Sequence, residues 1–223
     1  MKKGLTSLAL AGLVSTSAIA KINDGLYVGG GVGVTDGRHR VHLDESSTSS
    51  DFTVDQQKFA LAVLLGFGWV FDKFYVGGEL DVAYSPHKGT ADINVNATGP
   101  TGARVSVSTN FGYGAALRLG YLLMDCCMVF VRIGCEMRKF NAKVDLVNNV
   151  ADDVDQSFTK VGIVPGIGFE TCINEDGLTL GGEFRTARFG SETKGGGTTA
   201  VKVTPRVDTY LVTVRYNLQD KLA

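Results

Sequence analysis

The sequence has no interior apolar run that approaches the roughly 18 residues of a membrane-spanning helix. A helical membrane protein is therefore excluded. The sequence also lacks an excess of basic residues, because 22 lysines and arginines stand against 23 acidic residues. Without a basic stripe the chain has no electrostatic means of holding nucleic acid, so we expect no nucleic-acid partner.

Motifs for cofactor and metal chemistry are missing too. Glycines within 29–33 have G-x-G spacing, but no helical pattern follows them, which excludes a phosphate-binding loop. His39 and His42 are spaced like two metal ligands, yet no third ligand accompanies them. The acidic residues within 152–155 lack the pattern of a calcium-binding loop. We interpret the glycines as inward strand residues and the histidines and acidic residues as solvated loop residues, and we predict no cofactor and no metal.

A hydrolase site is the remaining catalytic possibility. Ser85 and His87 would lie at the outer rim of the predicted fold, where they could act on lipid headgroups. A nucleophile and a base also need a group that orients the base, and no such acid is evident. We therefore predict that the protein is not an enzyme and keep a lipid-modifying enzyme as an alternative.

Residues 1–20 have the three parts of a secretory signal peptide. Lys2 and Lys3 supply the positive start, residues 5–14 the apolar middle, and Ala18-Ile19-Ala20 a small-x-small cleavage site. The alternative is a short N-terminal helix of the mature fold. Cleavage would leave 20 basic against 23 acidic residues, a formal net charge of −3.

The segment 58–84 alternates between apolar and small or charged residues. Side chains of a strand point to opposite faces in turn, so this segment predicts two strands joined at Asp72-Lys73. One face is bulky and apolar, and the other carries Glu79 and Asp81 among glycine and alanine. Bulk outside and charge inside is the pattern of a transmembrane β-barrel.

The alternation recurs in eight segments, with long and short connections in strict succession. An even number of strands places both chain ends on the side of the short turns. The prediction is an all-β fold, an eight-stranded antiparallel up-and-down transmembrane β-barrel over 21–223, with a bulge at Pro165. The expected strands are 25–35, 58–71, 74–84, 104–121, 128–140, 158–171, 178–189 and 207–218, and the expected long loops are 36–57, 85–103, 141–157 and 190–205.

The two faces of the predicted barrel have different chemistry. An eight-stranded barrel is only wide enough for its own side chains, so we interpret the charged inner face as an ion-pair network that fills the lumen. The inward charged residues are Glu79, Asp81, Arg118, Arg132, Glu136, Arg138, Lys160, Glu170, Glu183, Arg185 and Arg215. The lipid-facing residues include Phe59, Leu61, Val63, Leu65, Phe67, Trp69, Leu117, Leu119, Val129, Val131, Val212 and Val214.

Aromatic residues and cysteines gather near the predicted strand ends. The aromatics suit interfacial girdles, with ordinary strand propensity as the alternative. Cys127 starts one strand and Cys172 ends the next, so a disulfide between them is predicted, with Cys126 as a competing partner. The candidate girdle residues are Tyr27, Trp69, Phe71, Phe74, Tyr84, Tyr121, Phe140, Phe158, Phe189, Tyr210 and Tyr216.

Four motifs resemble the OmpA-like and Opacity-protein-like small outer-membrane barrels, over the whole of 21–223. They are Leu26-Tyr27-Val28-Gly29-Gly30-Gly31-Val32-Gly33, Phe74-Tyr75-Val76-Gly77-Gly78-Glu79, Leu117-Arg118-Leu119-Gly120-Tyr121 and Val164-Pro165-Gly166-Ile167-Gly168-Phe169-Glu170. The resemblance implies insertion into the outer membrane of a Gram-negative bacterium by the barrel-assembly machinery, which reads the last strand. Here Tyr216-Asn217-Leu218 is followed by 219–223, so the usual terminal aromatic is replaced.

The expected role is structural or interactive at the cell surface. A monomeric barrel surrounded by outer-membrane lipid would display four long loops for adhesion, antigenic display or membrane integrity, because loops on rigid scaffolds carry binding functions. A host or other cell-surface ligand is the expected loop partner. The alternatives are a small gated channel and a soluble ligand carrier, and a carrier would need an apolar lumen.

Overall fold

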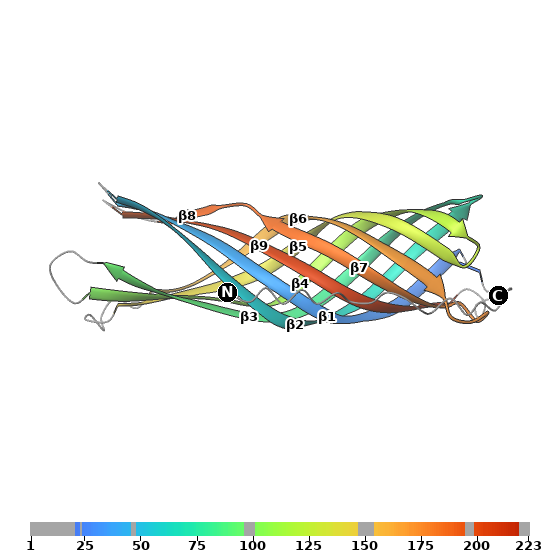
Figure 1. The fold of residues 1–223 in the computed structure, drawn as a ribbon, viewed down its shortest axis with the longest axis horizontal. Helices are drawn as coiled ribbons and strands as arrows, with labels where there is room; N and C mark the ends of the chain where they lie inside the picture. The colour runs from blue at the N-terminus through green and yellow to red at the C-terminus, as the bar shows by residue number, and fades with distance from the viewer. Residues whose placement is uncertain are drawn as a thin grey trace, which may run out of the picture.

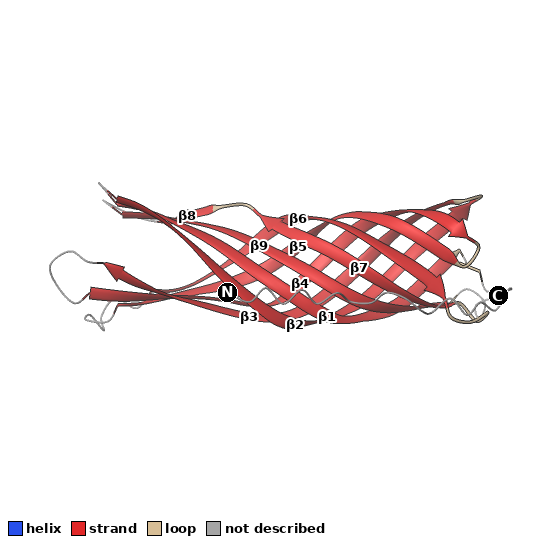
Figure 2. Ribbon diagram, viewed as in Figure 1, coloured by secondary structure: helices blue, strands red, loops and turns tan. Residues whose placement is uncertain are grey.

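The computed structural model describes residues 21–22, 24–45, 48–95, 101–146, 154–194 and 199–218. Side chains are described within 21–22, 24–38, 57–86, 108–141, 157–191 and 204–218. This part of the chain consists of strands and turns (Figure 2). Within it, no helix has the length and apolar character needed to cross a membrane.

Antiparallel strands form a single closed sheet. Each strand from β1 to β6 pairs with the next, β7 pairs with β9, and β9 returns to pair with β1. The three-residue strand β8 pairs with β9 just beyond the end of β7. We therefore count β7 and β8 as one interrupted strand, which gives a barrel of eight strands. The strands are β1 (Gly25–Glu45), β2 (Thr48–Phe71), β3 (Phe74–Val95), β4 (Thr101–Met124), β5 (Cys127–Leu146), β6 (Val154–Cys172), β7 (Leu178–Phe189), β8 (Glu192–Lys194) and β9 (Thr199–Asn217).

The two ends of the barrel differ. The short turns at 72–73, 125–126 and 173–177 lie at one end, together with the beginning of β1 and the end of β9 (Figure 1). The longer hairpins project from the other end. This arrangement confirms the predicted fold class.

The predicted long loops are wrong over most of their length, because the strands continue through them. In the β1–β2 hairpin, pairing runs out to Glu45 and Thr48, and in the β3–β4 hairpin it runs out to Val95 and Thr101. These outer parts contain many polar residues and glycines, and only short apolar alternations remain in them, such as Val41-His42-Leu43 and Ile93-Asn94-Val95. Alternations this short, set among polar residues and glycines, are a weak strand signal, and the sequence therefore favoured loops there.

Pairing is interrupted at two places in the outer half of the barrel. The β2–β3 ladder begins at Leu61 and Tyr84, and the β6–β7 ladder begins at Gly162 and Phe189. The outer strand segments therefore separate into one group from β8, β9, β1 and β2 and another from β3 to β6 (Figure 1).

The bulge predicted at Pro165 is wrong. The β5–β6 register runs through Pro165 without a shift, and the β6–β7 register is the same on both sides of it. Only the pairing of Val164 and Pro165 with β7 is lost, because proline has no N–H to donate. The register shifts lie elsewhere, between Tyr84 and His87 and at two points of the β4–β5 ladder.

Large apolar side chains cover the outside of the wall. All twelve residues expected to face lipid are exposed, with Val63 and Leu117 at 63% and 64%. Ring pairs such as Phe67–Trp69 and Phe74–Tyr121, at 4.6 and 5.5 Å between centroids, join this surface. A surface so apolar is suited to hydrocarbon and not to water.

Smaller apolar clusters lie inside the lumen on both sides of the charged residues. Ile22, Tyr75, Leu122, Met128 and Phe130 form one near the short turns, where the Ile22 N–H donates to the Asp125 carbonyl at 3.0 Å. The clusters of the outer half are Phe140, Val164, Ala187, Phe189 and Val207, and Ala60, Ala62, Leu64 and Leu211.

Three predicted girdle aromatics lie in the lumen instead. Tyr27, Phe140 and Phe189 are 6%, 0% and 4% exposed. They stand near strand ends as expected, but each shares its face with inward residues of its own strand, as Phe140 does with Arg138. The face of the strand on which an aromatic residue lies therefore predicts its location better than its closeness to the strand end. Of the remaining candidates, Phe158 stacks on Phe140 at 5.6 Å, Tyr216 is partly buried, and Trp69, Phe71, Phe74, Tyr84, Tyr121 and Tyr210 are exposed.

The seam where β1 closes on β9 depends on glycine. A Cβ atom at Gly33 would overlap the Tyr210 carbonyl group, whereas one at Gly30 would lie 3.6 Å from the Ala62 carbonyl oxygen. We expect Gly33→Ala to destabilise the barrel by about 1–3 kcal/mol, the usual cost of overpacking, and Gly30→Ala to have little effect. The temperature at which each variant loses its folded mobility on unheated gels measures this. Equal transitions for the two variants would contradict a close approach at Gly33.

Candidate functional site

A network of charged side chains crosses the lumen in its short-turn half. Six strands supply it, because the inward positions of β3, β4, β5, β6, β7 and β9 all carry charge at this level. Glycines on the same faces provide the space: a Cβ atom at Gly114 would lie 2.6 Å from Asp81 Oδ1, and one at Gly112 would lie 2.5 Å from Glu136 Oε1. The small residues of the inner face therefore make room for long charged ones.

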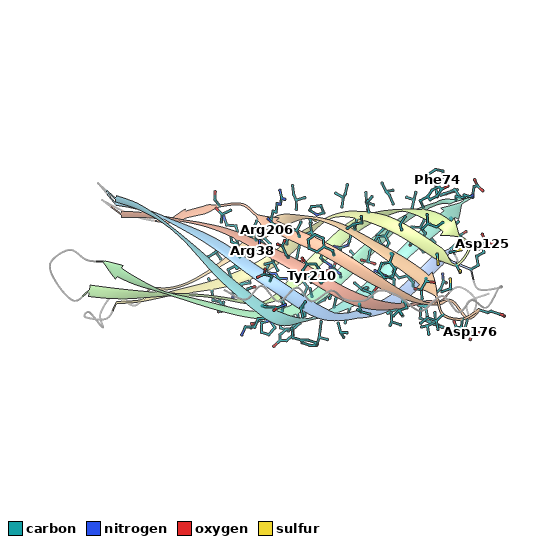
Figure 3. All side chains as sticks on the ribbon, viewed as in Figure 1. Arg38, Phe74, Asp125, Asp176, Arg206 and Tyr210 are labelled. Carbon is teal, nitrogen blue, oxygen red and sulfur yellow. The ribbon has the colours of Figure 1, made fainter. Side chains whose placement is uncertain are left out.

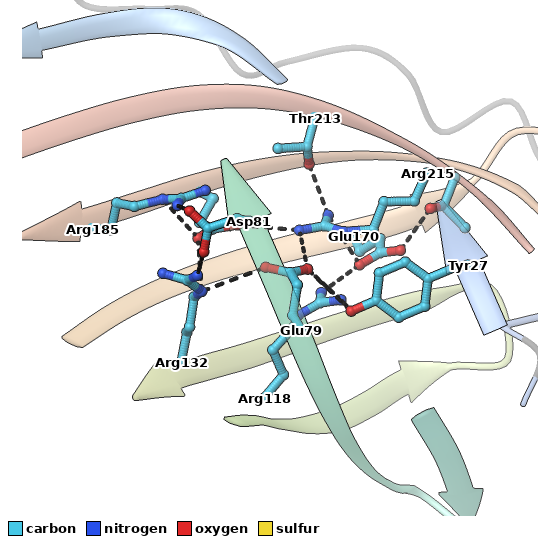
Figure 4. A network of polar contacts seen from close by, with 11 residues as sticks. Tyr27, Glu79, Asp81, Arg118, Arg132, Glu170, Arg185, Thr213 and Arg215 are labelled. Carbon is cyan, nitrogen blue, oxygen red and sulfur yellow. Dashed lines mark hydrogen bonds and ion pairs between the residues drawn. The ribbon is translucent and has the colours of Figure 1, made fainter. Parts of the chain in front are cut away.

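Glu79 lies at the centre of the network. Its Oε2 is 3.3 Å from Arg215 Nη2 and 3.7 Å from Arg118 Nη1, and its Oε1 is 3.5 Å from Arg132 Nε. The Tyr27 hydroxyl donates to Glu79 Oε2 at 3.0 Å and accepts from Arg118 Nη1 at 3.1 Å. One carboxylate is thus surrounded by three guanidinium groups and a phenol (Figure 4).

Asp81 and Glu183 hold the side of the network nearer the hairpins. Asp81 accepts from Arg132 Nη2 and, at 3.0 Å, from Arg185 Nη1. Glu183 Oε1 lies 3.2 Å from Arg185 Nε, and its Oε2 accepts from Arg215 Nη2 at 3.1 Å. Asp81 therefore links two arginines of different strands (Figure 4).

Glu170 holds the side nearer the short turns. Its Oε2 accepts from Arg118 Nη2 at 2.6 Å and from Arg215 Nη1 at 3.4 Å, and its Oε1 accepts from the Thr179 hydroxyl at 2.6 Å. Arg215 Nη1 also donates to Thr213 Oγ1 at 2.8 Å. The Arg118 guanidinium lies 4.0 Å from the centroid of the Phe130 ring, a cation–π contact that joins the network to the apolar cluster below.

Four arginines and four carboxylates balance each other in this network. All eight are at most 6% exposed. Hydrogen bonding is less complete than charge pairing: Arg132 Nε and Arg185 Nε lie within ion-pair range of carboxylates but make no hydrogen bond within the described chain. Charge balance therefore dominates, since an ion left uncompensated here would cost several kcal/mol.

A second, smaller group lies apart from the network. Arg138 Nε donates to Glu136 Oε1 at 2.7 Å, and Arg138 Nη1 donates to Ser85 Oγ at 2.8 Å. Ser85 was expected at the outer rim but is buried in the lumen at 3% exposure. Its inward position follows from the alternation of β3, in which Glu79 and Asp81 share its face.

A small cavity lies beside the network. A cavity of about 20 Å³ lies at the short-turn end, lined by residues that include Tyr27, Arg118, Glu170 and Arg215. A cavity of this size accommodates about one water molecule. This cavity therefore offers no room for a larger solute.

The predicted disulfide between Cys127 and Cys172 is wrong, since all four cysteines are free thiols. In the β5–β6 register Cys127 faces Thr171, and its Sγ lies 3.3 Å from the Thr171 hydroxyl. Cys172 lies one position further and donates its N–H to the Cys126 carbonyl at 2.9 Å. Burial raises the pKa of the Cys126 thiol above its usual value, which lowers its thiolate fraction.

Several other predicted residues cannot be placed in a site. His39, His42 and His87 lie in strands β1 and β3 and not in loops, and their side chains fall outside the described residues. Asp152 and Asp153 lie outside the described chain, as does the side chain of Asp155. Among described residues, no group of three or more histidine, cysteine, aspartate or glutamate side chains is placed to hold a metal ion.

Sequence reasoning missed the uncharged partners of the network. Tyr27, Thr179 and Thr213 each place a hydroxyl on a network carboxylate or arginine. Tyr27 shares the inward face of β1 with three glycines, and this position in the alternation could have indicated that its side chain lies in the lumen. The two threonines resemble other inward polar residues of their strands, and nothing in the sequence distinguishes them.

A closed antiparallel barrel that is apolar outside and charged inside defines the class of outer-membrane β-barrels. Residues 6–217 match the family described as outer membrane protein beta-barrel domain, and the chain belongs to that family. This membership supports a location in the outer membrane of a Gram-negative bacterium, in contact with lipid. No curated sequence matches the chain.

Solved structures of outer-membrane barrels resemble the chain at low identity. The outer membrane protease OmpT from Escherichia coli has a TM-score of 0.51 and 6% identity, covering 91% of this chain and 99% of its own. Neisserial surface protein A has a TM-score of 0.42 and 14% identity, covering 87% of this chain and 97% of its own. The outer membrane protein OprG from Pseudomonas aeruginosa has a TM-score of 0.46 and 15% identity, covering 89% of this chain and 98% of its own. At these identities the likeness concerns the fold alone.

Removing one arginine from the network should destabilise the barrel strongly. Arg118→Met takes away the closest cationic partner of Glu170 and leaves carboxylates undercompensated, so we expect a loss of about 3–5 kcal/mol. Arg38→Met, which removes a largely exposed partner of Asp36, should cost at most about 1 kcal/mol. The transition on unheated gels compares the two. A transition unchanged by Arg118→Met would contradict a structural role for the network.

Proposed function

We propose that this protein is a non-conducting outer-membrane scaffold that holds paired strands out beyond the membrane for contact with other cells or molecules. The observation that carries this proposal is the continuation of β-pairing past the end of the apolar outer surface. On β1 and β2, Val34 and Phe59 lie opposite each other and are the outermost large apolar residues described there. Beyond them the outward positions are Asp36, Arg38 and Gln57.

The projecting hairpins are long and regularly paired. From Thr35 and Lys58 to Glu45 and Thr48, β1 and β2 form eleven consecutive pairs, which is about 35 Å along the strands at ~3.3 Å per residue. Continuous pairing satisfies the backbone of these segments without a membrane around them. Stiff projections of this kind suit contact with a partner surface, which is why display of the hairpins is the function we favour over membrane integrity alone.

The filled lumen argues against transport. A small gated channel would need a path through the lumen, and the charged network leaves a cavity for about one water molecule. Opening a path would separate buried ion pairs, at a cost of several kcal/mol for each uncompensated charge. We therefore favour a closed barrel over the channel alternative.

Bilayer recordings test the closed lumen. We expect the purified protein to give no discrete current steps in planar bilayers, because its ion pairs hold the lumen shut. The same recordings on Glu79→Gln and Arg132→Gln variants serve as the comparison. Discrete steps in the unaltered protein, with a size that changes in these two variants, would establish the channel alternative instead.

Shortening one hairpin tests the surface role. Replacing residues 36–57 by a short turn should leave the barrel folded, since the β2–β3 ladder begins only at Leu61, while reducing attachment of expressing bacteria to host-cell monolayers. A matched replacement of the β3–β4 hairpin over 87–108 shows which projection binds. Gel mobility and trypsin treatment of intact cells verify folding and exposure. Attachment that survives removal of both hairpins would disprove the proposed role.

A further inference from the structure

Three cysteines lie close together at the short-turn end of the barrel. Cys126 belongs to the turn between β4 and β5, Cys127 begins β5, and Cys172 ends β6. All three are partly exposed thiols. Figure 3 marks this end of the barrel by Asp125, the residue before Cys126, and by Asp176 of the turn after β6. The charged network includes none of these thiols, so its structural role does not account for them.

Strand register places Cys126 directly opposite Cys172. The last pair of the β5–β6 ladder is Cys127 with Thr171. One position further, Cys172 donates its N–H to the Cys126 carbonyl at 2.9 Å, which continues the ladder by one pair. Residues opposed across such a hydrogen bond have Cα atoms about 5.5 Å apart. This separation lies within the range of about 4.4–6.8 Å that a disulfide spans.

The other two pairings suit a disulfide less well. The Sγ atoms of Cys126 and Cys127 are 3.9 Å apart. However, consecutive Cα atoms are only about 3.8 Å apart, which is below the disulfide range. Cys127 and Cys172 are one position out of register, and successive side chains of a strand point to opposite faces. The backbone therefore favours Cys126 as the partner of Cys172.

The location of the barrel supplies the conditions for oxidation. Short turns of outer-membrane barrels face the periplasm, where disulfides form and persist. Cys172 packs against the apolar cluster that contains Ile22 and Met128, whereas Cys126 lies in the turn. An oxidant that approaches from the periplasm therefore meets Cys126 first. The structure holds both residues as thiols, the reduced form of the pair.

We propose that Cys126 and Cys172 are a redox-active pair that closes to a disulfide in the periplasm by exchange with a disulfide-bearing oxidant. The Cys126 thiolate attacks one sulfur of the oxidant, and the other sulfur leaves as a thiolate. The Cys126 side chain rotates about its Cα–Cβ bond toward Cys172, whose thiolate attacks the Cys126 sulfur and displaces the rest of the oxidant. The two cysteines lose two electrons and two protons, and the oxidant is reduced to two thiols.

The new bond would fasten the short-turn mouth of the barrel. It links the β4–β5 turn, in which the Asp125 carbonyl accepts the Ile22 N–H at 3.0 Å, to the end of β6. Strands β5 and β6 and the hairpin between them become one closed loop, which restricts the unfolded chain and so stabilises the folded one. The inference depends on the outer-membrane location of the barrel and not on the proposed hairpin function.

Peptide mapping tests the pairing. Outer membranes of expressing bacteria are treated with N-ethylmaleimide without reductant, and the digested protein is analysed by mass spectrometry for alkylated and disulfide-linked peptides. We expect Cys126 to be linked to Cys172, and Cys127 and Cys135 to be alkylated. Cys127→Ser is the matched control, because it makes the same change as Cys126→Ser at the neighbouring position. The link should remain in Cys127→Ser and disappear in Cys126→Ser.

Unfolding of the purified barrel tests the effect of the bond. In glutathione disulfide, the unaltered protein and Cys127→Ser should lose folded mobility on unheated gels at least about 5 °C higher than in dithiothreitol. Cys126→Ser should show no such shift and should match the reduced unaltered protein, which shows that it folds. The proposal is wrong if Cys126 and Cys172 stay alkylatable under both conditions, if Cys172 is linked to Cys127 or to another copy, or if oxidation leaves the transition unchanged.

Discussion

Mutual neutralisation of buried charge is the constraint on which this barrel depends. Its wall turns apolar side chains outward at the level of the membrane, so the long charged side chains of the inward positions at that level lie buried in the lumen. Such charges are tolerable only when each acid meets a base. Glu79 forms ion pairs with three arginines from three other strands. The need to pair charges therefore links strands that are far apart in the sequence. Pairing of charge thereby fixes how the strands face one another.

The same constraint explains which features the sequence predicts well. Residues 58–84 alternate clearly because one face meets hydrocarbon and the other meets the crowded lumen, and the fold class follows from that contrast. The signal fades where the contrast ends. Beyond Val34 and Phe59 the apolar face keeps only a few apolar residues, such as Val41 and Phe52, among many polar ones, so the strand signal is weak there. Alternation of apolar and polar residues shows that the two faces of a strand meet different environments. A strand can form without such a difference.

Details of the lumen needed three-dimensional information for a different reason. The inward charged residues follow from the alternation of side chains along each strand. Their ion-pair partners depend on strand register and tilt, which bring Arg118 to Glu170 and Arg185 to Asp81. Tyr27 and Phe140 show that closeness to a strand end does not decide between girdle and lumen. The cysteines make the same point, because a shift of one residue in register puts Thr171 opposite Cys127.

The closing seam between β1 and β9 joins the two most distant parts of the sequence. Its ladder pairs Tyr27 with Asn217 and Glu45 with Thr199, so none of its contacts can form until the last strand has been delivered. High contact order of this kind slows folding. Until closure, both terminal strands present unpaired edges that invite aggregation. A chain built this way has to be kept apart from its own copies on the way to the membrane.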